Sequence, residues 1–174
     1  MKCLITALLV VGVAVWPMVE AGVTISASTD VTLPDQGAPP EPLVIVVNRM
    51  NPVEDLSFAD LRAIFLGSRS YWNNGKRITV VMREPGEQER RVVLHDICGM
   101  NEEQFKTHFL RGLYSGEILV TPKTLDTPPG VRKFIFNVPG AIGYLRESDV
   151  DATVKVVRID ERLPWDKGYR LHVP

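Results

Sequence analysis

An unbroken run of aliphatic, mostly β-branched residues at positions 43–47 (LVIVV) constrains the fold of this chain more than any other feature. Such a run predicts a strand covered on both faces, as in a parallel or mixed sheet, because a strand with one wet face alternates apolar and polar residues. A second apolar run follows at residues 78–82 (ITVVM), and a segment of helical periodicity lies between the two. Strand, helix and strand in this order indicate a βαβ-like unit. We therefore expect an α/β fold with a central mixed sheet flanked by helices.

The segment between the two runs carries several agreeing signals for one helix. Ser57 can cap it, and Asp60 follows three residues later, as in a capping box. Gly67 stands where a left-handed helix stop is expected. The apolar stripe of this helix comprises Phe58, Leu61, Ile64 and Phe65. Trp72 follows and precedes a tight Asn-Asn-Gly turn, so we expect it to be a structural anchor of the unit.

The first 21 residues have the pattern of an export signal. Lys2 supplies a positive start, residues 4–15 form an apolar core that is short for a membrane span, and residues 19–21 (VEA) fit a cleavage site. An uncleaved anchor helix is the alternative. We expect removal of residues 1–21, a periplasmic protein with no stable membrane span after cleavage, a flexible N-terminal arm at 22–42, and one domain at 43–174.

The remainder of the chain continues the alternation of helices and strands. We expect a helix over about residues 87–99, helices that begin after Asn101 and Thr127, and strands at 141–145 and 154–159. Asn101 and Gln104 fit a capping box. The helix that they begin is expected to bury Phe105, Phe109 and Leu113. The tail after residue 160 has enough apolar surface to pack back on the domain, through Trp165, Tyr169 and Leu171.

Composition and motifs argue against several functional classes. The 174 residues are 45% hydrophobic and 24% charged, with a net charge of −1, enough for one sizeable core. No dense Lys/Arg stripe is present, so we expect no nucleic-acid binding. The three histidines lack metal-ligand spacing, and no phosphate-cradling glycine loop or nucleophile elbow is found. Cys98 fits a small buried hydrophobe and His108 a structural histidine. We expect no enzyme activity, metal or cofactor.

Several short motifs carry a resemblance to a known family. Residues 48–52, then Leu56 with Ser57, then residues 64–67 (IFLG) with Trp72 five residues after the glycine, resemble the substrate-binding proteins of phosphate ABC transporters. Residues 139–144 (PGAIGY), before a Val-rich segment, are similar to a later strand of that family. The resemblance implies a type II periplasmic-binding-protein-like fold. Because the family has two lobes and this chain has too few residues for both, it implies a single lobe, the second.

The same resemblance implies where a ligand would bind, and here the sequence departs from the family. Members place an arginine after the second strand and Ser-Gly-Thr four residues later, at a helix start. The matching positions here are Arg83 and then Glu87, Gln88 and Glu89, preceded by Gly86. The candidate ligand-binding residues are therefore Arg83, Gly86, Glu87, Gln88 and Glu89, together with Asn48 after the first strand. Arg83 is either a ligand residue or an ordinary surface charge.

Two functions from different classes stay open at this point. The first is an exported solute-binding-like protein with a degenerate anion site, which holds a small anion or other solute near Arg83. The second is a module that uses the lobe as a scaffold to bind an envelope or membrane protein. Because Glu87 and Glu89 place carboxylates where the family binds its anion, we expect no tight binding of free phosphate.

Overall fold

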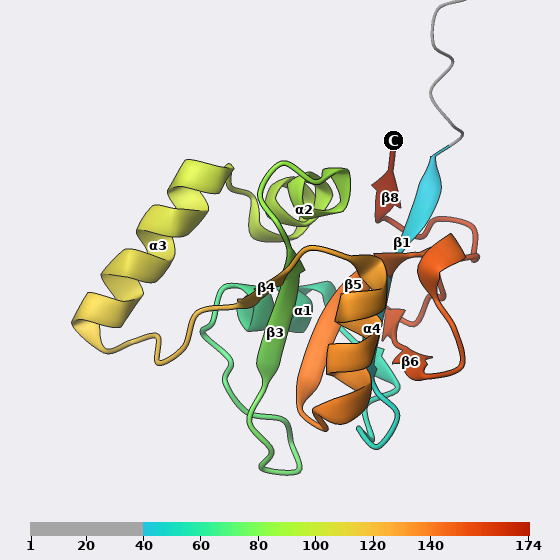
Figure 1. Cartoon of the computed structure of the whole chain (residues 1–174), viewed down its shortest axis with the longest axis horizontal. Helices are drawn as coiled ribbons and strands as arrows, with labels where there is room; N and C mark the ends of the chain where they lie inside the picture. Colours follow the sequence, from blue (N-terminus) through green and yellow to red (C-terminus); the bar gives the residue numbers. More distant parts are fainter. Residues whose placement is uncertain (1–39) are drawn as a thin grey trace, which may run out of the picture. The chain divides into compact units, whose positions relative to one another are not determined.

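The computed structural model describes residues 40–174, and a mixed sheet lies at its centre (Figure 1). The order of its strands is β4-β3-β5-β1-β6, and β8 pairs with the start of β1. These strands are β1 (Glu41–Asn48), β3 (Thr79–Arg83), β4 (Lys123–Leu125), β5 (Ala141–Arg146), β6 (Val154–Val156) and β8 (His172–Val173). A separate parallel pair joins β2 (Asp55–Leu56) to β7 (Arg158–Ile159). The expected export signal lies outside the described residues, as does the arm up to residue 39.

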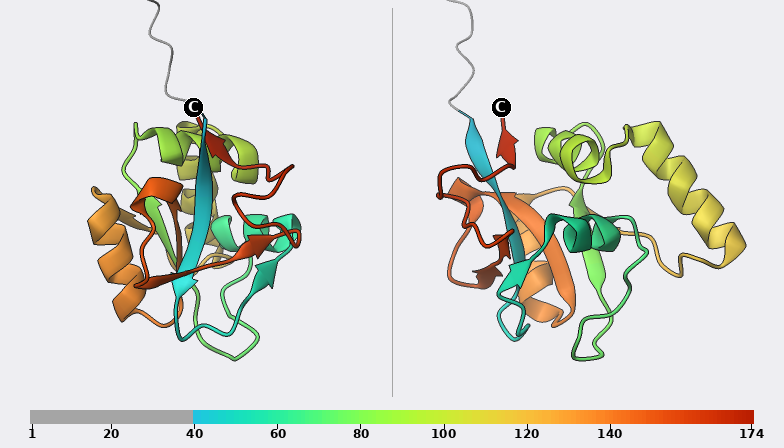
Figure 2. Two further views of the ribbon diagram at one scale, coloured as in Figure 1. Left: turned by 90° about the vertical axis from the view of Figure 1, so that its right-hand side faces the viewer. Right: turned by 180° about the vertical axis from the view of Figure 1, so that it is seen from behind.

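Strand β1 is covered on both faces, as its composition predicts. Leu43, Ile45 and Val47 belong to one core, whereas Val44 and Val46 belong to a second core on the opposite face. Helix α4 (Pro128–Asn137) covers the second face. The first face is covered by α1 (Phe58–Phe65), α2 (Gln88–Val92) and the helical segment η1 (Val93–Cys98), as Figure 2 shows from two sides. The α/β class with a central mixed sheet flanked by helices is confirmed.

The expected βαβ-like pairing of the first two long strands is wrong. Strand β5 lies between β1 and β3, parallel to β3 and antiparallel to β1. Strands β1 and β3 therefore run in opposite directions and do not touch as neighbours. An apolar run predicts that a strand is buried on both faces, but any equally apolar strand can be its neighbour. Here the neighbour of β1 is β5, which comes later in the chain than β3.

Trp72 joins the two stretches of sequence that carried the family resemblance. Its side chain is 3% exposed, and Nε1 donates a hydrogen bond of 3.0 Å to the carbonyl of Gly140. No residue larger than glycine fits at position 140, because a Cβ there would lie 2.0 Å from the carbonyl oxygen of Arg77. The IFLG…W and PGAIGY segments are thus in direct contact, and Trp72 is buried as a structural anchor should be.

The expected helix ends agree with the structure at several positions. Ser57 accepts a hydrogen bond from the backbone of Asp60, and Gly67 has a φ of +78°, the left-handed stop. Thr127 caps α4 in the same way. The helix expected at about 87–99 is present, but its second half, η1, has π-helical geometry before it ends at Gly99. The strand expected at 154–159 is divided into β6 and β7.

Helix α3 (Glu102–Ser115) begins with the reciprocal capping box of Asn101 and Gln104 that the sequence predicts, and it extends away from the sheet (Figure 2). Phe105 and Phe109 are buried, but Leu113 is 40% exposed, so its assignment to the core was wrong. Leu113 lies at the border of the narrow stripe by which the helix contacts the domain.

The C-terminal tail packs back on the domain as expected, with one exception. Tyr169 and Leu171 are buried, and the Tyr169 hydroxyl donates to the Leu43 carbonyl at 2.8 Å. Trp165 is 60% exposed, contrary to expectation, because the turn that carries it projects into solvent. Strand β8 pairs with residues 41 and 42, which is why β1 begins two residues before the apolar run.

Candidate functional site

Arg83 ends β3 and lies in a buried position, 7% exposed, at the carboxyl edge of the sheet. Its backbone N–H donates to the Tyr144 hydroxyl at 2.9 Å. The Arg83 guanidinium donates from Nη1 to the carbonyl of Asp126, at the start of the α4 region. Burial raises the pKa of the Tyr144 phenol, so that side chain stays neutral and acts only through hydrogen bonds. Arg83 is therefore a fixed side chain with defined partners, not an ordinary surface charge.

Glu87 forms an ion pair with Arg83. Its carboxylate lies 3.1 Å from Nη2 of Arg83. Glu87 is also the N-cap residue of α2, yet its side chain accepts no capping hydrogen bond and turns to the arginine instead. Gly86 has a φ of +98°, a conformation that costs a glycine little and that brings Glu87 round toward Arg83. The protein thus supplies the carboxylate that neutralises its own candidate anion-binding arginine.

Gln88 and Glu89 are engaged by a second arginine, Arg146, at the end of β5. Arg146 donates from Nε to Glu89 at 2.5 Å and from Nη2 to Gln88 at 2.7 Å. The hydrogen bond with Glu89 raises the pKa of Arg146 further above its ordinary value, and Glu41 contributes from 3.5 Å. Glu89 is only 8% exposed. This carboxylate therefore has a partner in the fold and is not directed at solvent.

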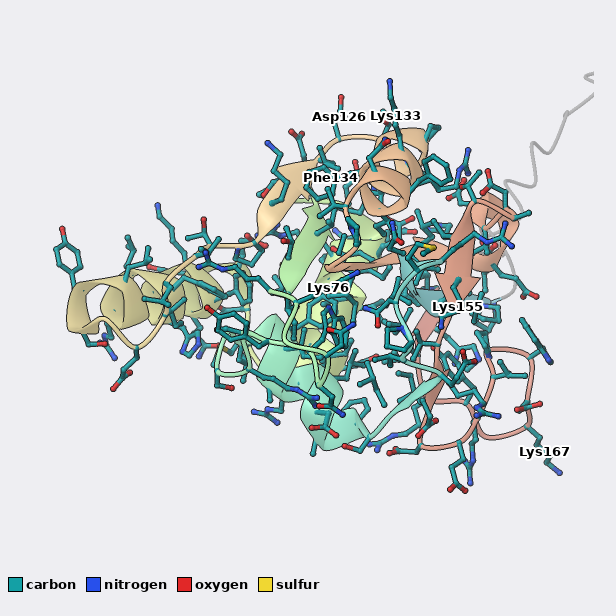
Figure 3. All side chains as sticks on the ribbon, turned by 90° about the horizontal axis from the view of Figure 1, so that it is seen from below. Lys76, Asp126, Lys133, Phe134, Lys155 and Lys167 are labelled. Atoms are coloured by element: carbon teal, nitrogen blue, oxygen red, sulfur yellow. The ribbon has the colours of Figure 1, made fainter. Side chains whose placement is uncertain are left out.

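The start of helix α4 lies at the same end of the sheet. The backbone of its first turn has no free N–H group. Residues 128 and 129 are both proline and have no N–H group. The next donor, the N–H of Gly130, is accepted by the Thr127 hydroxyl at 3.2 Å. Figure 3 shows Asp126 at the beginning of this helix and Lys133 on its outer side. No donor of the first turn of α4 remains to bind an anion.

Asn48 lies at the opposite edge of the sheet from the other five candidate residues. Its Nδ2 donates to the carbonyls of Ile135 and Phe136, each at 2.7 Å, and its Oδ1 accepts from the N–H of Met50 at 2.8 Å. The separation follows from topology, because β1 runs opposite to β3. The structure therefore brings Arg83, Gly86, Glu87, Gln88 and Glu89 together and leaves Asn48 in a structural role.

Four further residues contact this cluster, and the sequence interpretation missed them. They are Arg90, Asp126, Tyr144 and Arg146. Because β5 is parallel to β3, the last residue of β5, Arg146, lies at the same end of the sheet as Arg83, the last residue of β3. That relationship becomes visible only once the neighbour of β3 is known. The acceptor on Asp126 is a backbone carbonyl, which no residue type can signal.

Cys98 and His108 are held as structural side chains, and the described residues contain no metal-binding cluster. Within residues 40–174 no group of three or more His, Cys, Asp or Glu side chains could hold a metal ion. Burial raises the pKa of the Cys98 thiol to about 12, and His95 is exposed. His108 Nε2 lies 2.9 Å from the Leu66 carbonyl, a structural contact.

No family model matches this chain, and no curated protein matches it. Solved structures do. A protein of Clostridium perfringens, assigned as a phosphate ABC transporter substrate-binding protein and containing bound phosphate, is 24% identical with a TM-score of 0.59; the match covers 72% of this chain and 47% of that one. An ABC-type phosphate transport receptor of Vibrio cholerae is 20% identical with a TM-score of 0.52, over 72% and 48%. A phosphate-binding protein of Stenotrophomonas maltophilia is 16% identical with a TM-score of 0.51, over 72% and 40%.

These similarities concern the fold. The chain spans about half the length of the solved proteins that it matches, which fits a single lobe of the periplasmic-binding-protein fold. The resemblance found in the sequence motifs is confirmed at this level. Among the residues that the structure describes, no helix is long and apolar enough to cross a membrane.

Proposed function

We propose that this protein is an exported, non-enzymatic, solute-binding-like protein whose anion site is degenerate. The observation that carries this proposal is the Glu87 carboxylate, 3.1 Å from the arginine that would hold an anion. The solved structures of the same fold are of phosphate-binding and substrate-binding proteins, which supports a binding role and not a catalytic one. The signal-like pattern of residues 1–21 supports export to the periplasm.

The electrostatics of the site explain why we regard it as degenerate. Phosphate binding at a helix start uses free N–H groups and the positive end of the helix dipole. Glu87 places negative charge at the start of α2, where it satisfies that dipole and repels a dianion, and Glu89 adds a carboxylate that is already paired with Arg146. Each like-charge contact at about 4–5 Å costs on the order of a few kcal/mol before salt screening. A ligand that displaced Glu87 from Arg83 would also lose that ion pair.

Native mass spectrometry of protein purified from the envelope fraction tests this proposal. We expect a mass that begins after Ala21 and no retained phosphate, because export removes residues 1–21 and Glu87 occupies Arg83. A mass that includes residues 1–15 would contradict cleavage and indicate an anchor. Phosphate retained in stoichiometric amount through purification would contradict the degenerate site. A different retained solute would identify the ligand class.

One observation favours the second candidate function, a scaffold that binds an envelope protein. Asn48 fixes the backbones of Met50 and Phe136 at one edge, and these side chains are 75% and 55% exposed. Exposed apolar side chains held on a rigid edge fit a protein partner better than a small solute. Met50→Ser with Phe136→Ser would then reduce recovery of a stoichiometric envelope partner, whereas Trp165→Ser, which removes an exposed apolar residue elsewhere, would not. Equal recovery with both variants would exclude this edge.

A further inference from the structure

The segment formed by the second half of α3 and the loop after it carries more than half of the exposed large hydrophobic residues in the described part of the chain. Five of the nine exposed large hydrophobic residues lie within residues 110–120: Leu110, Leu113, Tyr114, Leu119 and Val120. Their exposure ranges from 40% at Leu113 to 92% at Tyr114. Scattered apolar residues on a surface are ordinary, but a cluster of this kind marks an interaction surface.

Helix α3 is attached to its own domain along one narrow stripe. Phe105 and Phe109 are buried, and Ile118 packs so closely on Gly112 that a Cβ there would lie 2.5 Å away. The loop after the helix therefore returns on the domain side and leaves the outer side uncovered. Grooves of about 1060 Å³ and 350 Å³ flank the helix on its two sides. Figure 3 shows α3 extending well clear of the sheet.

We propose that this surface binds a second copy of the same chain, with the two α3 helices antiparallel about a two-fold axis. The outer side of α3 carries a stripe at alternating spacings of four, three and four residues: Glu103, Thr107, Leu110 and Tyr114. This is the spacing of the contact positions in a two-helix coiled coil, with apolar residues at Leu110 and Tyr114 and polar residues at Glu103 and Thr107. A two-fold contact uses the same patch on both chains, so the patch must be complementary to itself.

The charges on α3 supply that self-complementarity. Glu102 is engaged by Arg90 within its own chain, at 2.5 and 2.9 Å, whereas Glu103 has no ion-pair partner among residues 40–174. When Leu110 lies opposite Thr107 of the second copy, Tyr114 lies opposite the second copy's Glu103. Arg111, one turn from Tyr114, then reaches the same carboxylate. The antiparallel arrangement also sets the two helix dipoles in opposition, which is favourable.

The oligomeric state of the protein purified from expression of the full chain tests this proposal. Sedimentation velocity over a range of concentrations should show a monomer–dimer equilibrium. Leu110→Glu with Tyr114→Ser should weaken the dimer at least hundredfold, because it puts a charge in the contact and removes apolar area from it. Both positions are substantially exposed, so the monomer should retain its thermal midpoint. Trp165→Ser, a change at an exposed apolar residue in the C-terminal tail, should leave the dimer unchanged.

A charge exchange tests the antiparallel register. Glu103→Arg alone and Arg111→Glu alone should each weaken the dimer about tenfold, since the two-fold axis repeats each lost contact. The double variant should recover most of the affinity, because the opposite charges face each other again. A monomer at all concentrations, or a dimer insensitive to the α3 variants, overturns the proposal. An envelope protein that binds this surface in place of a second copy also overturns it.

Discussion

The Glu87 carboxylate lies 3.1 Å from the Arg83 guanidinium, four residues earlier in the chain. The position of Glu87 is the one at which the sequence resemblance places a ligand-binding serine. On the function proposed here, this ion pair would stand in place of a contact between protein and ligand. Arg83 also has partners besides Glu87, because its backbone N–H donates to the Tyr144 hydroxyl and its guanidinium donates to the Asp126 carbonyl.

Trp72→Ala should destabilise the protein by roughly 3–5 kcal/mol. The indole is 3% exposed and donates to the Gly140 carbonyl, so alanine creates a cavity and leaves that carbonyl without its partner. Trp72→Phe keeps most of the buried area and removes the hydrogen bond, which should cost about 1 kcal/mol from that bond. Chemical denaturation of the unmodified protein, Trp72→Ala and Trp72→Phe measures the free energy lost with the whole ring and the part lost with the hydrogen bond. An unchanged unfolding midpoint for Trp72→Ala would show that the ring is not an anchor.

Glu41 should make the stability fall in acid. Burial on its own would raise the pKa of the Glu41 carboxyl, but hydrogen bonds from Ser148 and Arg146 and the charge of Arg146 outweigh it and lower the pKa below 4.5. A carboxyl with a lowered pKa in the folded state contributes stability above its unfolded pKa, and this is lost as the pH falls through the folded value.

The measurement that isolates Glu41 is urea unfolding as a function of pH, from neutral to below about pH 4. Glu41→Gln should lose less stability over this acidic range than the unmodified protein, since glutamine can still accept from Ser148 but does not titrate. Glu84→Gln, at an exposed position, is the charge-matched control and should follow the unmodified protein. If the free energy of unfolding fell equally with pH in Glu41→Gln and in the unmodified protein, Glu41 would not contribute to the acid sensitivity.

The Cys98 thiol should be unreactive in the folded protein. Burial raises its pKa to about 12, so the thiolate that reacts with disulfide reagents is scarce as well as shielded. With the mature chain at about pH 8, a chromogenic disulfide reagent should label no thiol until denaturant is added, and then one. Rapid labelling of the native protein would mean that η1 opens readily, a result that hydrogen exchange at Ile97 would confirm.

The sequence predicts local structure well where one residue determines one contact. The caps at Ser57, Asn101 and Thr127 and the left-handed stop at Gly67 all depend on neighbours within a few residues, and all are present. The burial of β1 follows from its composition alone, since an apolar strand must be covered on both faces.

Features that depend on contacts distant in sequence could not be predicted in the same way. The insertion of β5 between β1 and β3 depends on which apolar strand is the better neighbour, and the misplaced Asn48 follows directly from that error. Leu113 fits a helical stripe, but α3 contacts the domain over a narrower face than the stripe suggests. At the candidate site, the sequence indicated the group from Arg83 to Glu89, while Arg146 was missed because strand order decides its position.

Titration calorimetry with inorganic phosphate at low salt tests the central claim, that the fold is retained while its anion site is filled by Glu87. The comparison is between the unmodified protein, Glu87→Ser, and the triple variant Glu87→Ser, Gln88→Gly, Glu89→Thr. Because Glu89 is buried and paired with Arg146, the triple variant needs its thermal midpoint measured first. Glu84→Ser removes a nearby exposed carboxylate without touching Arg83 and serves as the control.

We expect the unmodified protein and Glu84→Ser to give no heat of tight binding. Freeing Arg83 and removing the first-turn carboxylates should improve phosphate affinity by about two orders of magnitude in the variants, equivalent to a few kcal/mol. Binding that appears only in those variants would support a lobe that kept its shape and lost its anion. A submicromolar dissociation constant for phosphate in the unmodified protein would contradict the account.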